Sequence, residues 1–392
     1  MSTHCDCAES IQKADTRSFT EIDKISRGNL THINNSAPRA PHHGLYPIDG
    51  EKVDSSGQRH VACWLVACAA LVFAIVVIGG LTRLTHSGLS IVEWQPLVGA
   101  VPPLSNADWE VSFAGYRATP EFHLVNFDID LNGYKRIFWL EYVHRLLGRI
   151  TGLVFLLPLL WFVFRGAVRG ALAWRLGAVF VLGALQGAMG WYMVKSGLVD
   201  DPRVSQFRLT AHLGLAFVIL GAQLWTALEL LLPAARAERP VPIDARFAVA
   251  VATTIFLMVL SGGMVAGIRA GYAYNTFPLM NGHLVPPEIL LIEPWYQNFL
   301  YNMATVQFVH RSIAWLLMLL VPLLWWRVRK TPSLRGPAFV LLAILGVQVA
   351  LGITTLLLRV PVALAATHQA GAALLFAASL WVAHAAQAAH EH

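Results

Sequence analysis

The chain has 392 residues, of which 56% are hydrophobic and only 13% are charged, and its mean hydropathy is +0.54. A soluble domain of this length could not cover its surface with so few polar groups, so the composition excludes a soluble globular protein. The net charge of +6 comes from basic residues that gather in particular loops, which indicates membrane topology and argues against a nucleic-acid partner.

Apolar runs of about 20 residues recur along the chain, the length that crosses a hydrocarbon core about 30 Å thick. Eight of them are predicted to be transmembrane helices: 60–81, 143–164, 172–193, 207–231, 246–267, 304–326, 336–358 and 362–386. The chain is therefore expected to be an all-α integral membrane protein, surrounded by the lipid bilayer. Residues 1–58 are polar and lack apolar periodicity, so they are expected to form a disordered tail.

The second half of the chain repeats sequence words of the first half in the same order. The word "EYVHR" at 141–145 returns as "QFVHR" at 307–311, and "LTAHLG" at 209–214 returns as "LAATHQA" at 364–370. Agreement in order, spacing and wording indicates a duplication. Each copy spans four of the predicted helices, and both copies begin on the same side of the membrane, so their topology is parallel.

The duplication predicts two pseudo-symmetric four-helix bundles, one over residues 59–232 and one over residues 233–392. The loops at 82–142 and 268–303 are long and rich in Trp, Pro and Gly. We expect these two outer loops to be structured.

Charge predicts which side of the membrane each loop faces, because basic residues concentrate in cytoplasmic loops. Three loops on one side carry Arg165, Arg169, Arg175, Arg236, Arg239, Arg246, Arg327, Arg329, Lys330 and Arg335. The opposite loops are expected to face the periplasm or its equivalent, and they carry several acids, namely Glu93, Asp108, Glu110, Glu121, Asp128 and Asp130. An even number of spans then places both termini in the cytoplasm, and the simplest location is the inner membrane of a bacterial cell.

Four histidines occupy matched positions in the two copies, and each lies near the start of a predicted span that runs inward: His144, His212, His310 and His368. An imidazole inside a bilayer is costly and is usually functional. Imidazole is also an axial ligand of heme iron, and two imidazoles on facing helices saturate one iron. The pattern predicts two heme sites near the outer leaflet, one ligated by His144 and His212 and the other by His310 and His368.

Arginines accompany these histidines in both copies. Arg145 and Arg311 directly follow a histidine, and Arg83 and Arg269 lie just outside the first and fifth spans. Heme propionates are carboxylates, which pair well with guanidinium groups. Anchoring of the helix ends at the membrane surface is the alternative role for these four arginines.

One difference between the copies concerns a carboxylate. Glu141 precedes His144 by three residues, so both side chains project from one helix face, whereas the equivalent position in the second copy is Gln307. A carboxylate in a membrane span is a functional candidate. Glu141 either takes part in chemistry that only the first copy performs, or serves as a structural partner of Arg145 or another base.

Several words resemble those of the heme A synthase family: "GGLTRLTHSGLSIVEWQPLVGAVPP", "EYVHRLLGRITG", "FVHR" and "ATHQ". The resemblance covers the chain from about residue 60 to 386. It implies an oxidoreductase that oxidises the C8 methyl of heme O to a formyl group, giving heme A for cytochrome c oxidase. Two successive hydroxylations with water-derived oxygen are implied, followed by loss of water from a gem-diol. The outward loops contain no cysteine, so the chain is similar to the cysteine-less proteobacterial and mitochondrial subgroup.

The resemblance also implies roles for particular residues. His144 and His212 would hold the substrate heme, with Glu141 as the essential acidic group beside it. His310 and His368 would ligate a permanent heme b that relays electrons. The family's other expected partners are heme O synthase and cytochrome c oxidase assembly factors, an unidentified electron acceptor, and a second copy in a homo-oligomer.

Two other functions remain compatible with an eight-helix membrane protein. A di-heme b-type electron carrier would use the same four histidines without porphyrin chemistry. Its hemes, however, would usually lie near both membrane faces, whereas all four histidines here are predicted on one side. A transporter with parallel repeats would need polar residues at mid-membrane, where the predicted spans are mostly apolar apart from Gln186 and Gln348.

Overall fold

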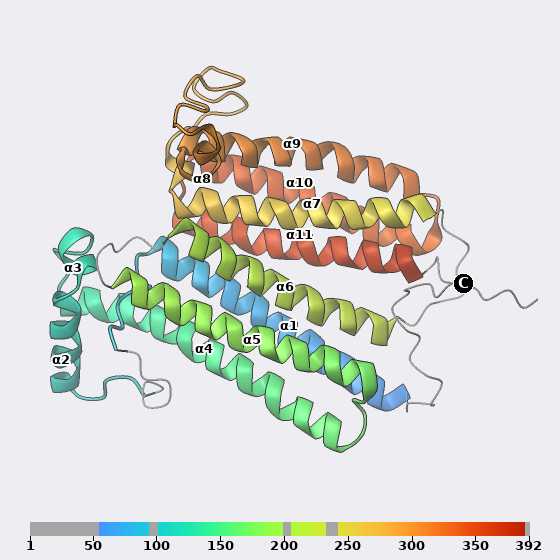
Figure 1. Cartoon of the computed structure of the whole chain (residues 1–392), viewed down its shortest axis with the longest axis horizontal. Helices are drawn as coiled ribbons and strands as arrows, with labels where there is room; N and C mark the ends of the chain where they lie inside the picture. The colour runs from blue at the N-terminus through green and yellow to red at the C-terminus, as the bar shows by residue number, and fades with distance from the viewer. Residues whose placement is uncertain (1–54, 94–100, 199–204, 233–241, 389–392) are drawn as a thin grey trace, which may run out of the picture. The chain divides into compact units, whose positions relative to one another are not determined.

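The computed structural model describes residues 55–93, 101–198, 205–232 and 242–388, which are helical without a β-strand in those ranges (Figure 1). Eight helices are long and apolar enough to cross a membrane: α1 (Ser55–Leu84), α4 (Leu131–Phe164), α5 (Gly170–Gly197), α6 (Gln206–Leu231), α7 (Pro242–Gly267), α9 (Met303–Val328), α10 (Pro332–Leu357) and α11 (Val362–Ala388). The prediction of an all-α, multi-pass membrane protein is confirmed. The predicted tail, 1–58, lies outside the described residues except for its last four, which begin α1.

The helices of the two sequence copies have matching neighbours. Helices α1 and α5 each pack against α4 and α6, and helices α7 and α10 each pack against α9 and α11. The two sets also touch each other, through α6 with α7 and through α11 with α1 and α6 (Figure 1). These neighbours are the ones that a duplicated four-helix unit requires, and the separation into two bundles stays a prediction.

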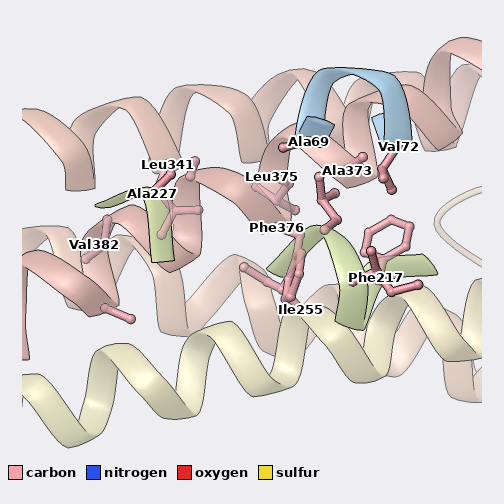
Figure 2. Close-up of a cluster of buried hydrophobic side chains, with 14 of the residues drawn as sticks. Ala69, Val72, Phe217, Ala227, Ile255, Leu341, Ala373, Leu375, Phe376 and Val382 are labelled. Carbon is pink, nitrogen blue, oxygen red and sulfur yellow. The ribbon is translucent and has the colours of Figure 1, made fainter. Parts of the chain in front are cut away.

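A single buried apolar cluster runs through both sets of helices. Figure 2 shows Phe217 of α6 and Ile255 of α7 beside Phe376 of α11, with Ala69 and Val72 of α1 close by. The rings of Phe217 and Phe376 have centroids 5.5 Å apart. Because the contact between the two sets is built from such side chains, the helices from both halves share one core.

The first outer loop contains two short helices, α2 (Asn106–Arg117) and α3 (Pro120–Leu124). Ser105 caps α2 through a reciprocal pair of hydrogen bonds with Asp108. Trp109 and Phe113 of α2 pack on the first turns of α4, where the rings of Trp109 and Phe138 have centroids 4.9 Å apart. We call α2 and α3 together the outer cap.

Helix α4 begins at Leu131, twelve residues before the predicted start at 143. The prediction was wrong because it required an apolar run, while the added turns are amphipathic and carry Lys135 and Arg136. Their apolar face supports the outer cap, and the Asp130 side chain caps the helix by accepting from the Gly133 N–H at 2.7 Å. His144 therefore lies in the middle of a long helix and not in its first turns.

The second outer loop is compact without long helices. It contains the 3₁₀ turns η2 (Ala270–Tyr272) and η3 (Trp295–Gln297) and the short helix α8 (Asn298–Tyr301). Asn298 is fully buried, and its amide donates to the carbonyl oxygens of Ile292 and Trp295 at 2.6 and 2.8 Å. The described parts of both outer loops are thus ordered, as predicted.

Candidate functional site

The four predicted histidines lie on four different helices, and the structure brings together the members of each predicted pair. His144 of α4 lies close enough to His212 of α6 for their charges to interact, and the same holds for His310 of α9 and His368 of α11. In each pair, the two helices that carry the histidines pack on the same two neighbouring helices. Each pair can therefore offer two imidazoles to one ligand.

A glycine on a neighbouring helix faces each histidine ring, and the four glycines are also repeat-equivalent. A Cβ atom built on Gly79 would lie 2.9 Å from His144 Nε2, and one on Gly262 would lie 3.4 Å from His310 Cε1. The corresponding distances are 3.2 Å from Gly190 to His212 Cε1 and 2.9 Å from Gly352 to His368 Cε1. The role of these glycines as ring contacts was not predicted, because spacing alone does not show which helices touch.

The glycine contacts predict different costs for the same substitution in the two halves. Gly79→Ala should displace the His144 ring, since 2.9 Å is shorter than a Cβ tolerates, whereas Gly262→Ala meets His310 at an ordinary contact distance of 3.4 Å. We expect Gly79→Ala to lower heme A formation about tenfold or more, the effect of misplacing a ligand. Gly262→Ala is the matched control and should leave it nearly unchanged. Heme A per purified protein measures both, and equal effects would contradict this reading of the contacts.

Two equivalent glutamines bind the backbone of the later histidine in each half. Gln186 Nε2 donates to the His212 carbonyl at 3.0 Å, and Gln348 Nε2 donates to the His368 carbonyl at 2.9 Å. The Nδ1 atoms of His212 and His368 are buried without a hydrogen-bond partner among the described residues. A buried imidazole nitrogen without a protein partner fits a ligand role.

The donors present suit a heme better than a bare metal ion. In the described ranges, no three His, Cys, Asp or Glu side chains gather as a metal site. A porphyrin supplies four of the six iron ligands itself, so two imidazoles complete the set. The pairs His144–His212 and His310–His368, each lined by glycines that leave room for a flat ring, fit this requirement.

Glu141 is 2% exposed and is held by donors from two directions. Its Oε2 accepts hydrogen bonds from Ser90 Oγ at 2.7 Å and from the Ile91 N–H at 2.9 Å. Its Oε1 accepts from Arg145, whose Nη2 lies 2.6 Å away. Because every donor faces an acceptor, the surroundings match an ionised carboxylate. The structural pairing with Arg145 is therefore present, and a chemical role would be additional to it.

The second half reproduces this arrangement without the negative charge. Gln307 is 3% exposed, its Oε1 accepts from Arg311 Nη2 at 3.2 Å, and its Nε2 donates to the Ala270 carbonyl at 2.9 Å. Glu141 therefore accepts from a backbone N–H at the place where Gln307 donates to a backbone carbonyl. The two halves keep the same link between span and outer loop and differ in charge.

Glu121 of the outer cap is a second buried carboxyl group, 4% exposed, and its Oε2 has no hydrogen-bond partner among the described residues. Burial and the negative charge of Glu141 raise the pKa of Glu121 to about 8. The group is therefore mostly protonated at neutral pH. The prediction that the loop of Glu121 faces outward is not tested by this burial, and the burial itself was not predicted, because composition does not show which loop side chains are covered.

Two of the four predicted arginines make contacts that tie the outer loops to the spans. Arg145 Nη2 donates to the Ile91 carbonyl at 3.0 Å, and Arg311 Nη2 donates to the Tyr274 carbonyl at 2.8 Å. Such bonds are compatible with a further contact to a propionate, because a guanidinium has five N–H donors.

Arg83 and Arg269 come from different halves, and they lie close enough for their charges to interact. Arg83 donates a hydrogen bond to the Ala266 carbonyl of α7, and the positive charges of Arg83 and Arg269 interact. Burial and these two charges hold the pKa of His86 below its usual value. His86 therefore lies uncharged beside two arginines whose positive charges would attract carboxylates.

Comparisons with known proteins agree with this arrangement. A protein of Nitrosospira multiformis named "Heme A synthase" is 58% identical over 332 residues, which cover 83% of this chain and 93% of the relative. Proteins of the same name from Nitrosomonas eutropha and Parvibaculum lavamentivorans are 53% and 46% identical, covering 84% and 85% of this chain and 95% and 96% of the relatives. Residues 62–380 match the family of cytochrome oxidase assembly proteins, COX15-CtaA, and the chain belongs to that family.

Proposed function

We propose that the chain oxidises the C8 methyl group of heme O to the formyl group of heme A, and that the first half holds the substrate between His144 and His212. The observation that carries the assignment of the first half is the charge difference three residues before the first histidine of each copy, Glu141 against Gln307. Relatives named heme A synthase, at 46–58% identity over most of the chain, support the reaction itself.

The reaction releases protons and develops positive charge, and Glu141 can respond to both. Each hydroxylation converts a C–H bond into a C–O bond with oxygen from water and releases two protons and two electrons. The second hydroxylation gives a gem-diol, which loses water to form the aldehyde. Positive charge develops beside the ring as electrons leave, and a fixed carboxylate stabilises it or accepts a released proton. Glu141, held on both oxygens, needs little reorganisation to do so.

The second half would hold a permanent heme b through His310 and His368. When bound, this group supplies one-electron transfer away from the substrate site. A half that only passes electrons needs no carboxylate, which agrees with the neutral Gln307. The same argument disfavours a di-heme carrier, in which neither half would need a charged Glu141. The cluster of Arg83, His86 and Arg269, together with Arg145 and Arg311, would bind propionates.

The basic ends of the spans would lie at the cytoplasmic face of a bacterial inner membrane. There, Arg165 stacks over Trp161 and Arg329 stacks over Trp326. Such pairs of an aromatic ring and a cation suit the membrane interface.

Extraction of the hemes from purified protein, followed by chromatography, tests the proposal. We expect heme B together with heme O or heme A, in about equal amounts, since each histidine pair completes one iron. Two equivalents of heme B alone would identify a di-heme carrier and contradict the proposed substrate site.

A further inference from the structure

The ring of His310 is held by a serine on the neighbouring helix. Ser261 of α7 directly precedes Gly262, and its Oγ lies 2.8 Å from His310 Nδ1. Both side chains are partly buried, and Gly262 touches the same ring. Ser261 is therefore placed to fix the orientation of one predicted iron ligand.

A second contact of Ser261 is compatible with one tautomer of His310. Ser261 Oγ also lies 2.8 Å from the Met258 carbonyl oxygen. A hydroxyl has one hydrogen and two lone pairs, so when that hydrogen is directed to Met258 the oxygen accepts from His310 Nδ1–H. Neutral His310 then carries its proton on Nδ1 and its lone pair on Nε2, the nitrogen that remains for iron.

Among the described residues, His144 has no counterpart of this serine contact, and the ring contact of the first half joins Gln186 Nε2 to His212 Nε2 at 3.3 Å. The words "IGGLTR" at 78–83 and "SGGMVAG" at 261–267 align through their paired glycines, and this alignment places Ile78 at the position of Ser261. The structure supports this register, because Gly79 faces the His144 ring and Gly262 faces the His310 ring. At this position α1 therefore carries a hydrocarbon side chain, which cannot accept a hydrogen bond.

We infer that Ser261 is a positioning residue that makes the second half retain its heme, and that Ile78 leaves the first half free to exchange substrate and product. The inference rests on the proposed function, in which the first half must release heme A and the second keeps heme b. A hydrogen bond to the outer nitrogen of a ligating imidazole fixes the ring and raises its basicity, and loss of such a partner typically lowers metal affinity about 10- to 100-fold.

The pair Ser261→Val and Ser261→Thr tests the inference, because the two variants differ in shape very little but only Thr keeps a hydroxyl. We expect Ser261→Val to lose heme b to an apomyoglobin trap about 10- to 100-fold faster than the parent protein and to raise its midpoint potential, since a less basic imidazole stabilises the ferric state less. Ser261→Thr should remain close to the parent in both measurements.

Ser379→Ala is the matched control. Ser379 of α11 is buried and donates to the Phe376 carbonyl at 2.7 Å, the same backbone bond that Ser261 makes to Met258. This variant should change neither heme loss nor potential. The role of Ser261 alone would be overturned if the parent protein contains heme b and Ser261→Val has the same heme loss and midpoint potential as Ser261→Thr and Ser379→Ala. A parent protein without heme b would overturn the proposed function and this role with it.

The reciprocal variant, Ile78→Ser, examines the exchange site. We expect it to slow the release of the first-half heme to the same trap, while heme b loss stays at the parent rate. Release that is unchanged or faster would contradict the assignment of Ile78 to exchange.

Discussion

Replacement of Glu141 by Gln is expected to reduce heme A formation at least about 100-fold, the lower range for removal of a positioned acid or base. The variant should accumulate heme O and keep heme b, because the second half is not altered. Pigments extracted from membranes that carry the variant, separated by chromatography, give both quantities. Heme A at the parent level would remove Glu141 from the mechanism.

The second half shows that glutamine can occupy this position in a folded protein, since Gln307 binds Arg311 there. In the first half the new amide nitrogen would face the Ile91 N–H, so a local adjustment of the loop is expected. Glu110→Gln is the matched control, because Glu110 is an exposed carboxylate on α2 of the same outer loop. That variant should form heme A normally, which separates the effect of the buried charge from a general loss of negative charge.

His310→Ala and His368→Ala are each expected to abolish the low-spin b-type spectrum of the purified protein. One imidazole cannot complete six-coordinate iron, so bound heme b should fall from about one per chain to a small fraction. The reduced-minus-oxidised absorption spectrum and the extracted heme B measure this loss. Full retention of the spectrum in both variants would contradict the assignment of heme b to the second half.

The corresponding first-half variants distinguish the two sites. His144→Ala and His212→Ala should keep the low-spin b-type spectrum and lose bound heme O and heme A, because these histidines lie in the other pair. A loss of heme B in these variants instead would exchange the roles of the halves.

Much of the architecture could be predicted because bilayer thickness imposes long apolar runs, which a sequence shows directly. The start of α4 could not be predicted from the apolar runs, because its first turns lie outside such a run and are stabilised by the outer cap. Aromatic residues at helical spacing, Tyr134, Phe138 and Tyr142, were the available signal. Such a pattern indicates a helix only once its packing partner is known.

Candidate site residues could be proposed from the sequence by comparing the two copies of the duplication. Features of the site that depend on packing between helices could not. The four histidines and Glu141 were found by comparing the two copies. The burial of Glu121, the ring contacts of Gly79 and Gly352, and the bond between Ser261 and His310 all depend on which helices meet, and spacing along one chain does not determine this.

One hydrogen bond between the halves connects the surroundings of the two histidine pairs. Gln369 follows His368 directly, and its amide holds the Val76 carbonyl of α1 at 2.7 Å, three residues before the glycine that touches His144. A rotation of α11 that reorients His368 would therefore be transmitted through this bond to α1, the helix that carries Gly79 beside His144. Under the proposed assignment, heme b bound at His310 and His368 would in this way stiffen the substrate site of the first half.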